Sequence, residues 1–184
     1  MDACENTIER RNHELMNLTL RRFFVNSWPN MANFTPVDPN DARELLQFMR
    51  RFYEVDHIHF IEEVARGAIE KMLDDESKGR IWWIQEGENR IGYVAITFCF
   101  SLEFGGPSAV VDELYLEESH RGRGIGFEAL RFVERFCRLR GILALHLEVD
   151  RGNLHAQALY RKAGYEDRNN YLLTKWLSDE SNVD

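Results

Sequence analysis

Cysteine is scarce in this sequence. Cys4, Cys99 and Cys137 are the only three, and their spacing matches neither a disulfide framework nor a metal site. We therefore expect no bound metal. An odd number of unpaired thiols is typical of a reducing compartment, and the cytoplasm is the simplest location. Because Cys99 and Cys137 stand in apolar runs, we expect both side chains to be buried.

Long apolar runs are missing as well. No stretch approaches the roughly 20 apolar residues that a membrane-spanning helix needs, so we expect no membrane partner. Charged residues interrupt the first 30 positions, which leaves no continuous apolar segment for a secretory signal. Arginines in this region would suit a transit peptide, but glutamates are interspersed and no serine occurs before Ser27.

The sequence has no excess of positive charge. Its net charge is -8 at pH 7, whereas nucleic-acid-binding proteins usually present a basic face to phosphates. We therefore expect no nucleic-acid partner. An acidic balance weakly favours a cationic small molecule or a basic peptide as the partner. The 184 residues, of which 44% are hydrophobic, suffice for one domain with its own core.

Hydrophobic periodicity predicts a mixed α/β (α+β) chain in one piece. We expect an N-terminal helical extension over residues 1–30, containing a helix at 5–24, and then one domain over residues 31–184. Asp38 is suited to cap the first helix of this domain, because Pro39 fits the first turn and Asp41 adds negative charge there. The last predicted strand, YLLTKWL, is an edge strand that would pair across a homodimer. The expected strands are 33–37, 80–87, 89–100, 109–118, 143–149 and 171–177, and the expected helices are 38–53, 58–73, a segment ending near 140, and 153–162.

One glycine-rich stretch separates a strand ending at Leu116 from an amphipathic helix. Three glycines alternate with other residues in RGRGIG, residues 121–126. The first amides of a helix are unpaired and the helix dipole is positive there, so such a turn favours an anion. Glycines let a phosphate approach the amides, and Arg121 and Arg123 would add charge-assisted contacts. The stretch therefore predicts a phosphate or pyrophosphate site, the local alternative being a turn with solvated arginines.

Two well-known phosphate loops do not fit these letters. The nucleotide-binding pattern GxxxxGK followed by Ser or Thr is absent. The dinucleotide pattern GxGxxG fails because Phe127 stands where its third glycine would fall. The stretch instead fits R-x-x-G-x-G at Arg121, Gly124 and Gly126.

A second motif lies near the C-terminal end of the chain, and it reads N-x-x-A-x-x-L-Y-x-K-x-G-[FY]. Together the two motifs resemble those of the GCN5-related N-acetyltransferase (GNAT) superfamily, and the order of predicted elements matches over about residues 33–177. The resemblance implies the GNAT acyl-CoA N-acyltransferase fold, a central mixed and mostly antiparallel sheet of six to seven strands flanked by helices. The second motif consists of Asn153, Ala156, Leu159, Tyr160, Lys162, Gly164 and Tyr165.

The resemblance also implies acetyl-CoA as the co-substrate. Its pyrophosphate would contact the amides of residues 121–126, and its pantetheine would lie along residues 114–116, in a gap where that strand parts from LALHLEV. The residues expected to bind it are Leu114, Tyr115, Leu116, Arg121, Gly122, Arg123, Gly124, Ile125, Gly126, Asn153, Ala156 and Tyr160.

The implied activity is transfer of an acetyl group to a primary amine, which needs a base because the amine is mostly protonated at pH 7. The resemblance implies a base either on the Asp112 face of the first strand or five residues before Asn153, at Glu148. Strand alternation predicts Asp112 on the face of Leu114 and Leu116, and Glu113 on the opposite face. All three carboxylates stay open as candidates, and each could equally be a solvated strand residue.

Tyr160 occupies the position from which family members protonate the coenzyme sulfur, although a core tyrosine would fit the same pattern. Asn153 is suited to cap its helix or to contact the coenzyme. Tyr53, His57 and Glu62 lie where the superfamily builds part of its acceptor site. We expect a small cationic amine as the acceptor, ahead of a peptide lysine or N-terminus. A non-catalytic acyl-CoA-binding sensor or interaction module is the alternative, against which Tyr160 and the candidate bases argue.

Overall fold

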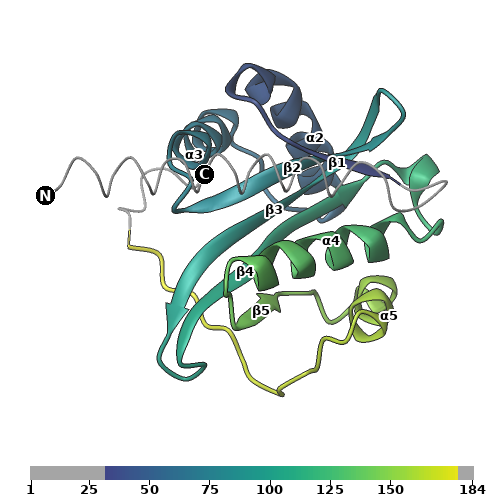
Figure 1. Ribbon diagram of the computed structural model, residues 1–184. Helices are drawn as coiled ribbons and strands as arrows, with labels where there is room; N and C mark the ends of the chain where they lie inside the picture. The colour runs from purple at the N-terminus through teal and green to yellow at the C-terminus, as the bar shows by residue number, and fades with distance from the viewer. Residues whose placement is uncertain (1–31, 178–184) are drawn as a thin grey trace, which may run out of the picture.

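A five-stranded sheet forms the centre of the protein in the computed structural model, which describes residues 32–177 (Figure 1). The strand order is β1-β2-β3-β4-β5. β5 runs parallel to β4, and all the other pairs are antiparallel. The mixed, mostly antiparallel sheet is thus confirmed, whereas the helix expected at 5–24 lies outside the described residues. The strands are β1 (Asn33–Pro36), β2 (Gly79–Glu86), β3 (Asn89–Ser101), β4 (Gly106–Leu116) and β5 (Ala144–Leu147).

Helices cover both faces of this sheet. α2 (Ala42–Val55) and α3 (Glu62–Asp74) lie on one face, and α4 (Ile125–Leu139) lies on the other (Figure 1). α5 (Leu154–Lys162) follows β5 and contacts α4. Two short 3-10 helices, η1 (Pro39–Asp41) and η2 (Glu118–His120), precede α2 and α4. The four expected helices of the domain are therefore all present.

Two adjacent tryptophans show how strand alternation builds two cores. Trp82 is 4% exposed and packs with Phe132 and Phe136 of α4, whereas Trp83 is 1% exposed and packs with Phe48 of α2. Successive side chains of a strand point to opposite faces, so each indole anchors a different helix layer. Both tryptophans therefore pack between the sheet and the helices that cover it.

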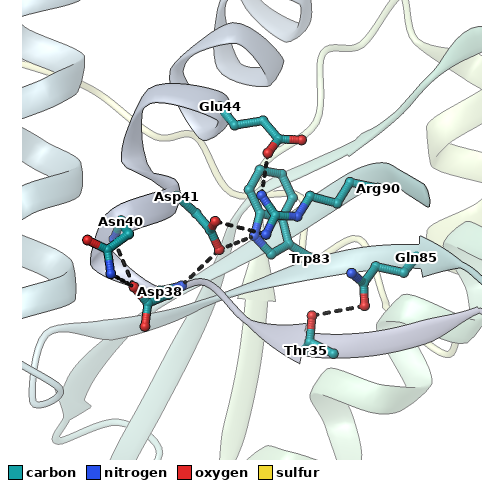
Figure 2. A network of polar contacts seen from close by, with 8 residues as sticks. All are labelled: Thr35, Asp38, Asn40, Asp41, Glu44, Trp83, Gln85 and Arg90. Atoms are coloured by element: carbon teal, nitrogen blue, oxygen red, sulfur yellow. Dashed lines mark hydrogen bonds and ion pairs between the residues drawn. The ribbon is translucent and has the colours of Figure 1, made fainter. Parts of the chain in front are cut away.

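The start of α2 is fixed by polar contacts, which Figure 2 shows. The Asp38 side chain caps η1 by accepting a hydrogen bond from the Asn40 amide at 2.9 Å, as expected from the sequence. Asp41 then accepts from the Trp83 indole at 3.1 Å and forms an ion pair with Arg90 at 2.8 Å. Burial would raise the pKa of Asp41, but the hydrogen bonds from Arg90 and Trp83 outweigh it and lower that pKa.

Two expectations about the chain are wrong. Residues 171–177 form no strand, so the described sheet has five strands rather than six to seven. An ion pair of 2.5 Å between Arg168 and Glu103 holds the preceding residues against the β3–β4 turn, and the apolar side chains of 171–177 stay exposed. Cys99 is exposed because it lies near the end of β3, while Cys137 is buried in α4 as expected. The homodimer through YLLTKWL stays a prediction.

Across residues 32–177, no helix has the length and apolar character that a bilayer crossing requires.

Candidate functional site

β4 and β5 part at the centre of the sheet. Their parallel pairing begins at Ser108 and Ala144 and ends at Val111 and Leu147. β4 then continues to Leu116 while β5 has ended. The side of β4 that faced β5 is therefore left without a strand partner within the described residues over its last five positions. This is the gap that the sequence analysis expected between the two strands.

A β-bulge marks the point where the strands part. Ala95 of β3 pairs with Glu113 and Ile96 pairs with Val111, so Asp112 has no partner across the ladder. The extra residue interrupts the alternation of side chains. Val111 packs into the α4-side core, whereas Glu113 contacts Tyr53 of α2 on the opposite face. The expectation that Asp112 shares the face of Leu114 and Leu116 rested on unbroken alternation, which the bulge removes.

Glu113 is held by two tyrosines from two other elements. Tyr53 of α2 donates its hydroxyl to Oε1 at 2.8 Å, and Tyr93 of β3 donates to Oε2 at 2.7 Å. The Asp112 carboxylate lies close enough for its charge to raise the pKa of both Tyr53 and Glu113. Tyr53, Asp112 and Glu113, three of the predicted site residues, thus come together.

Burial dominates the electrostatics of this cluster. It raises the pKa of Glu113, although the hydrogen bonds from Tyr93 and Tyr53 act in the opposite direction. Asp112 is an exposed residue, but the protein around its carboxyl group displaces enough water to raise its pKa as well. The pKa values of Tyr53 and Tyr93 are raised by burial and by the Glu113 charge. Both phenols therefore stay protonated and serve as donors at neutral pH.

The glycine stretch forms the turn from η2 into α4. Gly122 and Gly124 have φ angles of 72° and 89°, in the left-handed region that side chains other than glycine rarely adopt. A Cβ atom at either position would meet no atom within 4 Å, so both face open space. In the first backbone hydrogen bond of α4, the Glu128 amide donates to the Gly124 carbonyl, with 3.2 Å between nitrogen and oxygen. The amides of the first turn before Glu128 have no acceptor within the helix and can bind an anion.

Gly126 has a different role from the other two glycines. A Cβ atom there would lie 3.2 Å from Leu159 Cδ2 and 3.8 Å from Leu116 Cδ1. Gly126 therefore permits the close approach of α4, α5 and the end of β4. This contact brings the second motif against the first.

The two arginines of the stretch make contacts within the protein. Arg121 Nε donates to the Leu116 carbonyl at 2.8 Å, and its guanidinium lies 5.6 Å from the centre of the Tyr115 ring. Arg123 forms an ion pair with Glu86 at 2.5 Å. Both arginines are exposed and can therefore reach a phosphate in solvent. Each would contact it either while still bonded to its present partner, the Leu116 carbonyl or Glu86, or after that bond breaks.

α5 presents the other predicted coenzyme residues. The Asn153 side chain caps the helix by accepting from the Ala156 amide at 3.0 Å, which confirms its capping role. Tyr160 packs against the α4-side core, and its ring centre lies 6.0 Å from that of Tyr165. Burial, followed by the charge of Asp56, raises the pKa of Tyr160. No other described residue hydrogen bonds its hydroxyl.

The remaining predicted residues are more scattered. Glu148 is exposed and directly follows β5, on the far side of the gap from Asp112. His57 is exposed with a φ of 55°, just after α2. Glu62 begins α3 and forms ion pairs with Arg50 at 2.5 Å and Arg66 at 2.6 Å. Glu62 makes no hydrogen bond or ion pair with Tyr53, Asp112 or Glu113 among the described residues.

Tyr93 is a residue of this cluster that no sequence motif indicated. Alternation along β3 could place its side chain on the α2 face, but only the strand register and the bulge bring it to Glu113. In the described part of the chain, no group of three or more His, Cys, Asp or Glu residues is arranged to hold a metal ion.

Comparison with known proteins gives a consistent picture. The model of the acetyltransferase (GNAT) family matches residues 42–165. A curated relative, GCN5-related N-acetyltransferase 6, chloroplastic, from Arabidopsis thaliana, is 33% identical over 82 residues. The match covers 45% of this chain and 23% of that protein, so the chain corresponds to about a quarter of that relative's length.

Solved structures share the fold. An integron cassette protein from the mobile metagenome of Cole Harbour Salt Marsh is 30% identical, with a TM-score of 0.71 over 79% of this chain and 90% of its own. A predicted acetyltransferase with acetyl-CoA from Clostridium acetobutylicum is 20% identical, with a TM-score of 0.68 over 79% of this chain and 96% of its own. The second likeness concerns the fold alone.

Proposed function

Because the chain belongs to the acetyltransferase (GNAT) family, we propose that it transfers an acetyl group from acetyl-CoA to a primary amine, with a small cationic amine as the preferred acceptor. The observation that carries this proposal is the parting of β4 and β5 beside the glycine turn, with the carboxylates of Asp112 and Glu113 at the point of parting.

The residues present fit the coenzyme. The first amides of α4 and the open space at Gly122 and Gly124 suit the pyrophosphate. The backbone of residues 114–116 faces the gap and suits the pantetheine, which can pair with it like an extra strand. Bound there, acetyl-CoA would supply an activated acyl group, a thioester, to the end of the gap.

Asp112 or Glu148 would remove a proton from the ammonium group of the acceptor. An amine with a lysine-like pKa of about 10.4 is protonated at pH 7, and its deprotonation costs about 4 to 5 kcal/mol. A carboxylate beside the gap accepts this proton, directly or through one water molecule. The neutral amine then forms the N–C bond as the C–S bond of the thioester breaks. The nitrogen releases its second proton to water, and Tyr160, once it has protonated the sulfur, regains a proton from water.

Tyr160 would protonate the departing sulfur. Its raised pKa keeps the hydroxyl protonated at neutral pH, and no other described side chain competes for it as a hydrogen-bond partner. An ordinary phenol of pKa about 10 is a weaker acid than a thiol of pKa about 8.5 by about 2 kcal/mol, and the raised pKa of Tyr160 widens this mismatch. A strong hydrogen bond to the sulfur would therefore contribute alongside full proton transfer.

The charges around the gap favour a cationic acceptor. The charges of Asp112 and Glu113 raise the pKa of Tyr53, and the charge of Asp56 raises the pKa of Tyr160. None of the three carboxylates forms an ion pair with another described residue. The net charge of -8 has the same sign. A cation would find uncompensated negative charge at the site, which raises its local concentration.

The test combines coenzyme binding with turnover. The protein is mixed with acetyl-CoA and a panel of diamines, polyamines, aminoglycosides and lysine peptides, and both the thermal shift and the released thiol are measured. We expect a thermal shift with acetyl-CoA and thiol release with a cationic amine. A shift without thiol release against any amine would support the non-catalytic binding module instead. No shift with acetyl-CoA would contradict the coenzyme site.

A further inference from the structure

Glu86 of β2 holds one of the two arginines of the glycine stretch. Its Oε1 accepts a hydrogen bond from Arg123 Nη2 at 2.5 Å, and its Oε2 accepts from Nη1 of the same guanidinium at 3.3 Å. His120 Nε2 lies 3.6 Å from Oε2. An arginine fork binds carboxylates and phosphates through the same pair of N–H groups. The Glu86 carboxylate therefore occupies the donors that a phosphate would use.

The sheet register places Glu86 beside the glycine turn. Glu86 is the last residue of β2 and pairs with Asn89 across the turn into β3. β3 then runs beside the end of β4, where the Glu117 amide donates to the Ile91 carbonyl at 2.9 Å. The chain continues from Glu117 through η2 to Arg123. The β2–β3 turn and the glycine turn are thus neighbours at one end of the sheet.

Arg123 stands inside the glycine turn itself. The residues on either side of it, Gly122 and Gly124, have φ angles of 72° and 89° and face open space. The first amides of α4 follow directly and have no acceptor within the helix. Because Glu86 is paired with Arg123, the free protein already carries a negative charge at the turn that the pyrophosphate would enter.

The ion pair is open to water and can separate easily. The side chains of Arg123 and Glu86 are 50% and 45% exposed. Ion pairs at such positions stabilise a protein only weakly, because water solvates both charges once they part. A pyrophosphate carries more negative charge than a carboxylate, and it can also bind the first amides of α4. It is therefore the stronger ligand for the same guanidinium and can displace Glu86.

We propose that Glu86 is an internal competitor of the coenzyme: it holds Arg123 in the free protein and releases it when the pyrophosphate binds, which lowers the affinity for acetyl-CoA. This assignment rests on the proposed function. The other role open to the ion pair is to position Arg123 for the phosphate. Removing a competitor tightens coenzyme binding, whereas removing a positioning residue weakens it. The sign of the change therefore decides between the two roles.

The first experiment measures the Kd of the full chain for acetyl-CoA by calorimetry. Glu86→Gln should lower this Kd by about three- to tenfold, the range expected for loss of an exposed ion pair and of a nearby like charge. Glu88→Gln is the matched control, because it removes the same charge from an exposed residue of the same turn that has no ion pair with another described residue. An unchanged or higher Kd in Glu86→Gln, or an equal fall in both variants, overturns the proposal.

A double-mutant cycle assigns the effect to the ion pair. Arg123→Gln should raise the Kd for acetyl-CoA, since a charge-assisted contact to phosphate is lost. In that background Glu86→Gln should lose most of its effect, because no guanidinium is left to release. If Glu86→Gln tightens binding as much without Arg123 as with it, the two residues do not compete in the way proposed.

Inorganic pyrophosphate distinguishes this proposal from the proposed function. NMR of the nitrogen-15-labelled chain follows the amides of residues 122–127 as pyrophosphate is added. Glu86→Gln should bind pyrophosphate more tightly than the wild type, and Glu88→Gln should not. If acetyl-CoA binds to none of the proteins while pyrophosphate keeps this order, the proposed function fails and the competition stands. If neither ligand binds to Glu86→Gln, both proposals fail.

Discussion

Leu159 of α5 lies against the bare backbone of Gly126 in α4, where an added Cβ atom would come within 3.2 Å of its Cδ2 atom. We expect Gly126→Ala to lower the free energy of unfolding by about 1 kcal/mol, because overpacking costs more than the gain in helix propensity. Urea denaturation measures the change. In a double-mutant cycle with Leu159→Ala, the alanine at 126 should cost less, and strict additivity would contradict the contact.

The left-handed turn at Gly124 gives a second prediction. Its φ of 89° is strained for alanine, so Gly124→Ala should cost about 1 to 2 kcal/mol although the position faces open space. The same change should weaken acetyl-CoA binding, measured by calorimetry, since the turn presents the α4 amides. Gly67→Ala in α3 is the control: it meets no atom within 4 Å and should stabilise the protein by about 0.5 to 1 kcal/mol. Equal effects of the two substitutions would rule out backbone strain at Gly124.

Tyr160 and Tyr165 form a matched pair for testing the acid. Tyr160→Phe should lower kcat severalfold or more while leaving the Kd for acetyl-CoA nearly unchanged, because only the proton donor is lost. Tyr165→Phe should leave kcat unchanged and raise stability by up to about 1 kcal/mol, since its buried hydroxyl has no hydrogen-bond partner among the described residues. An unaffected rate in Tyr160→Phe would remove this residue as the acid.

Asp41 should make stability depend on pH. Its native pKa lies below the ordinary value of 3.8, so its contribution is present above pH 3.8 and is lost as the pH falls through the lower native value. Asp41→Asn should therefore destabilise the protein at pH 6 and make a smaller difference near pH 3. Urea denaturation at both pH values measures this, with Asp74→Asn on α3 as the control. A difference between wild type and Asp41→Asn that is independent of pH would argue against the Arg90 ion pair.

The segment 171–177 can be tested through its tryptophan. Trp176 is 80% exposed, so Trp176→Ala should change the free energy of unfolding by no more than about 0.5 kcal/mol. Light scattering of both proteins over a range of concentrations reports on the homodimer. A stability loss of several kcal/mol, or a dimer that dissociates on substitution, would mean that this segment pairs with a sheet edge.

Local patterns were sufficient for most elements of the fold. The strand and helix periods, the Asp38 cap and the glycines at 122 and 124 depend on neighbours within a few residues, and sequence shows these directly. The two motifs also indicated the family, which the match of the acetyltransferase (GNAT) family model to residues 42–165 confirms. Segment 171–177 was misjudged since strand propensity says nothing about whether an edge is available.

The sequence by itself determined the order of the elements, the glycine turn before α4, and the acidic character of the chain. The tertiary structure alone decided that Asp112 sits in a bulge and that Tyr53 and Tyr93, from two other elements, clamp Glu113. The physical reason is that the bulge and the strand register arise from hydrogen bonding between β3 and β4, and the residue pattern of either strand alone does not contain this information. A single extra residue in β4 changes which carboxylates lie on the same face of the sheet. The alternation of polar and apolar residues along one strand does not show where such an extra residue occurs.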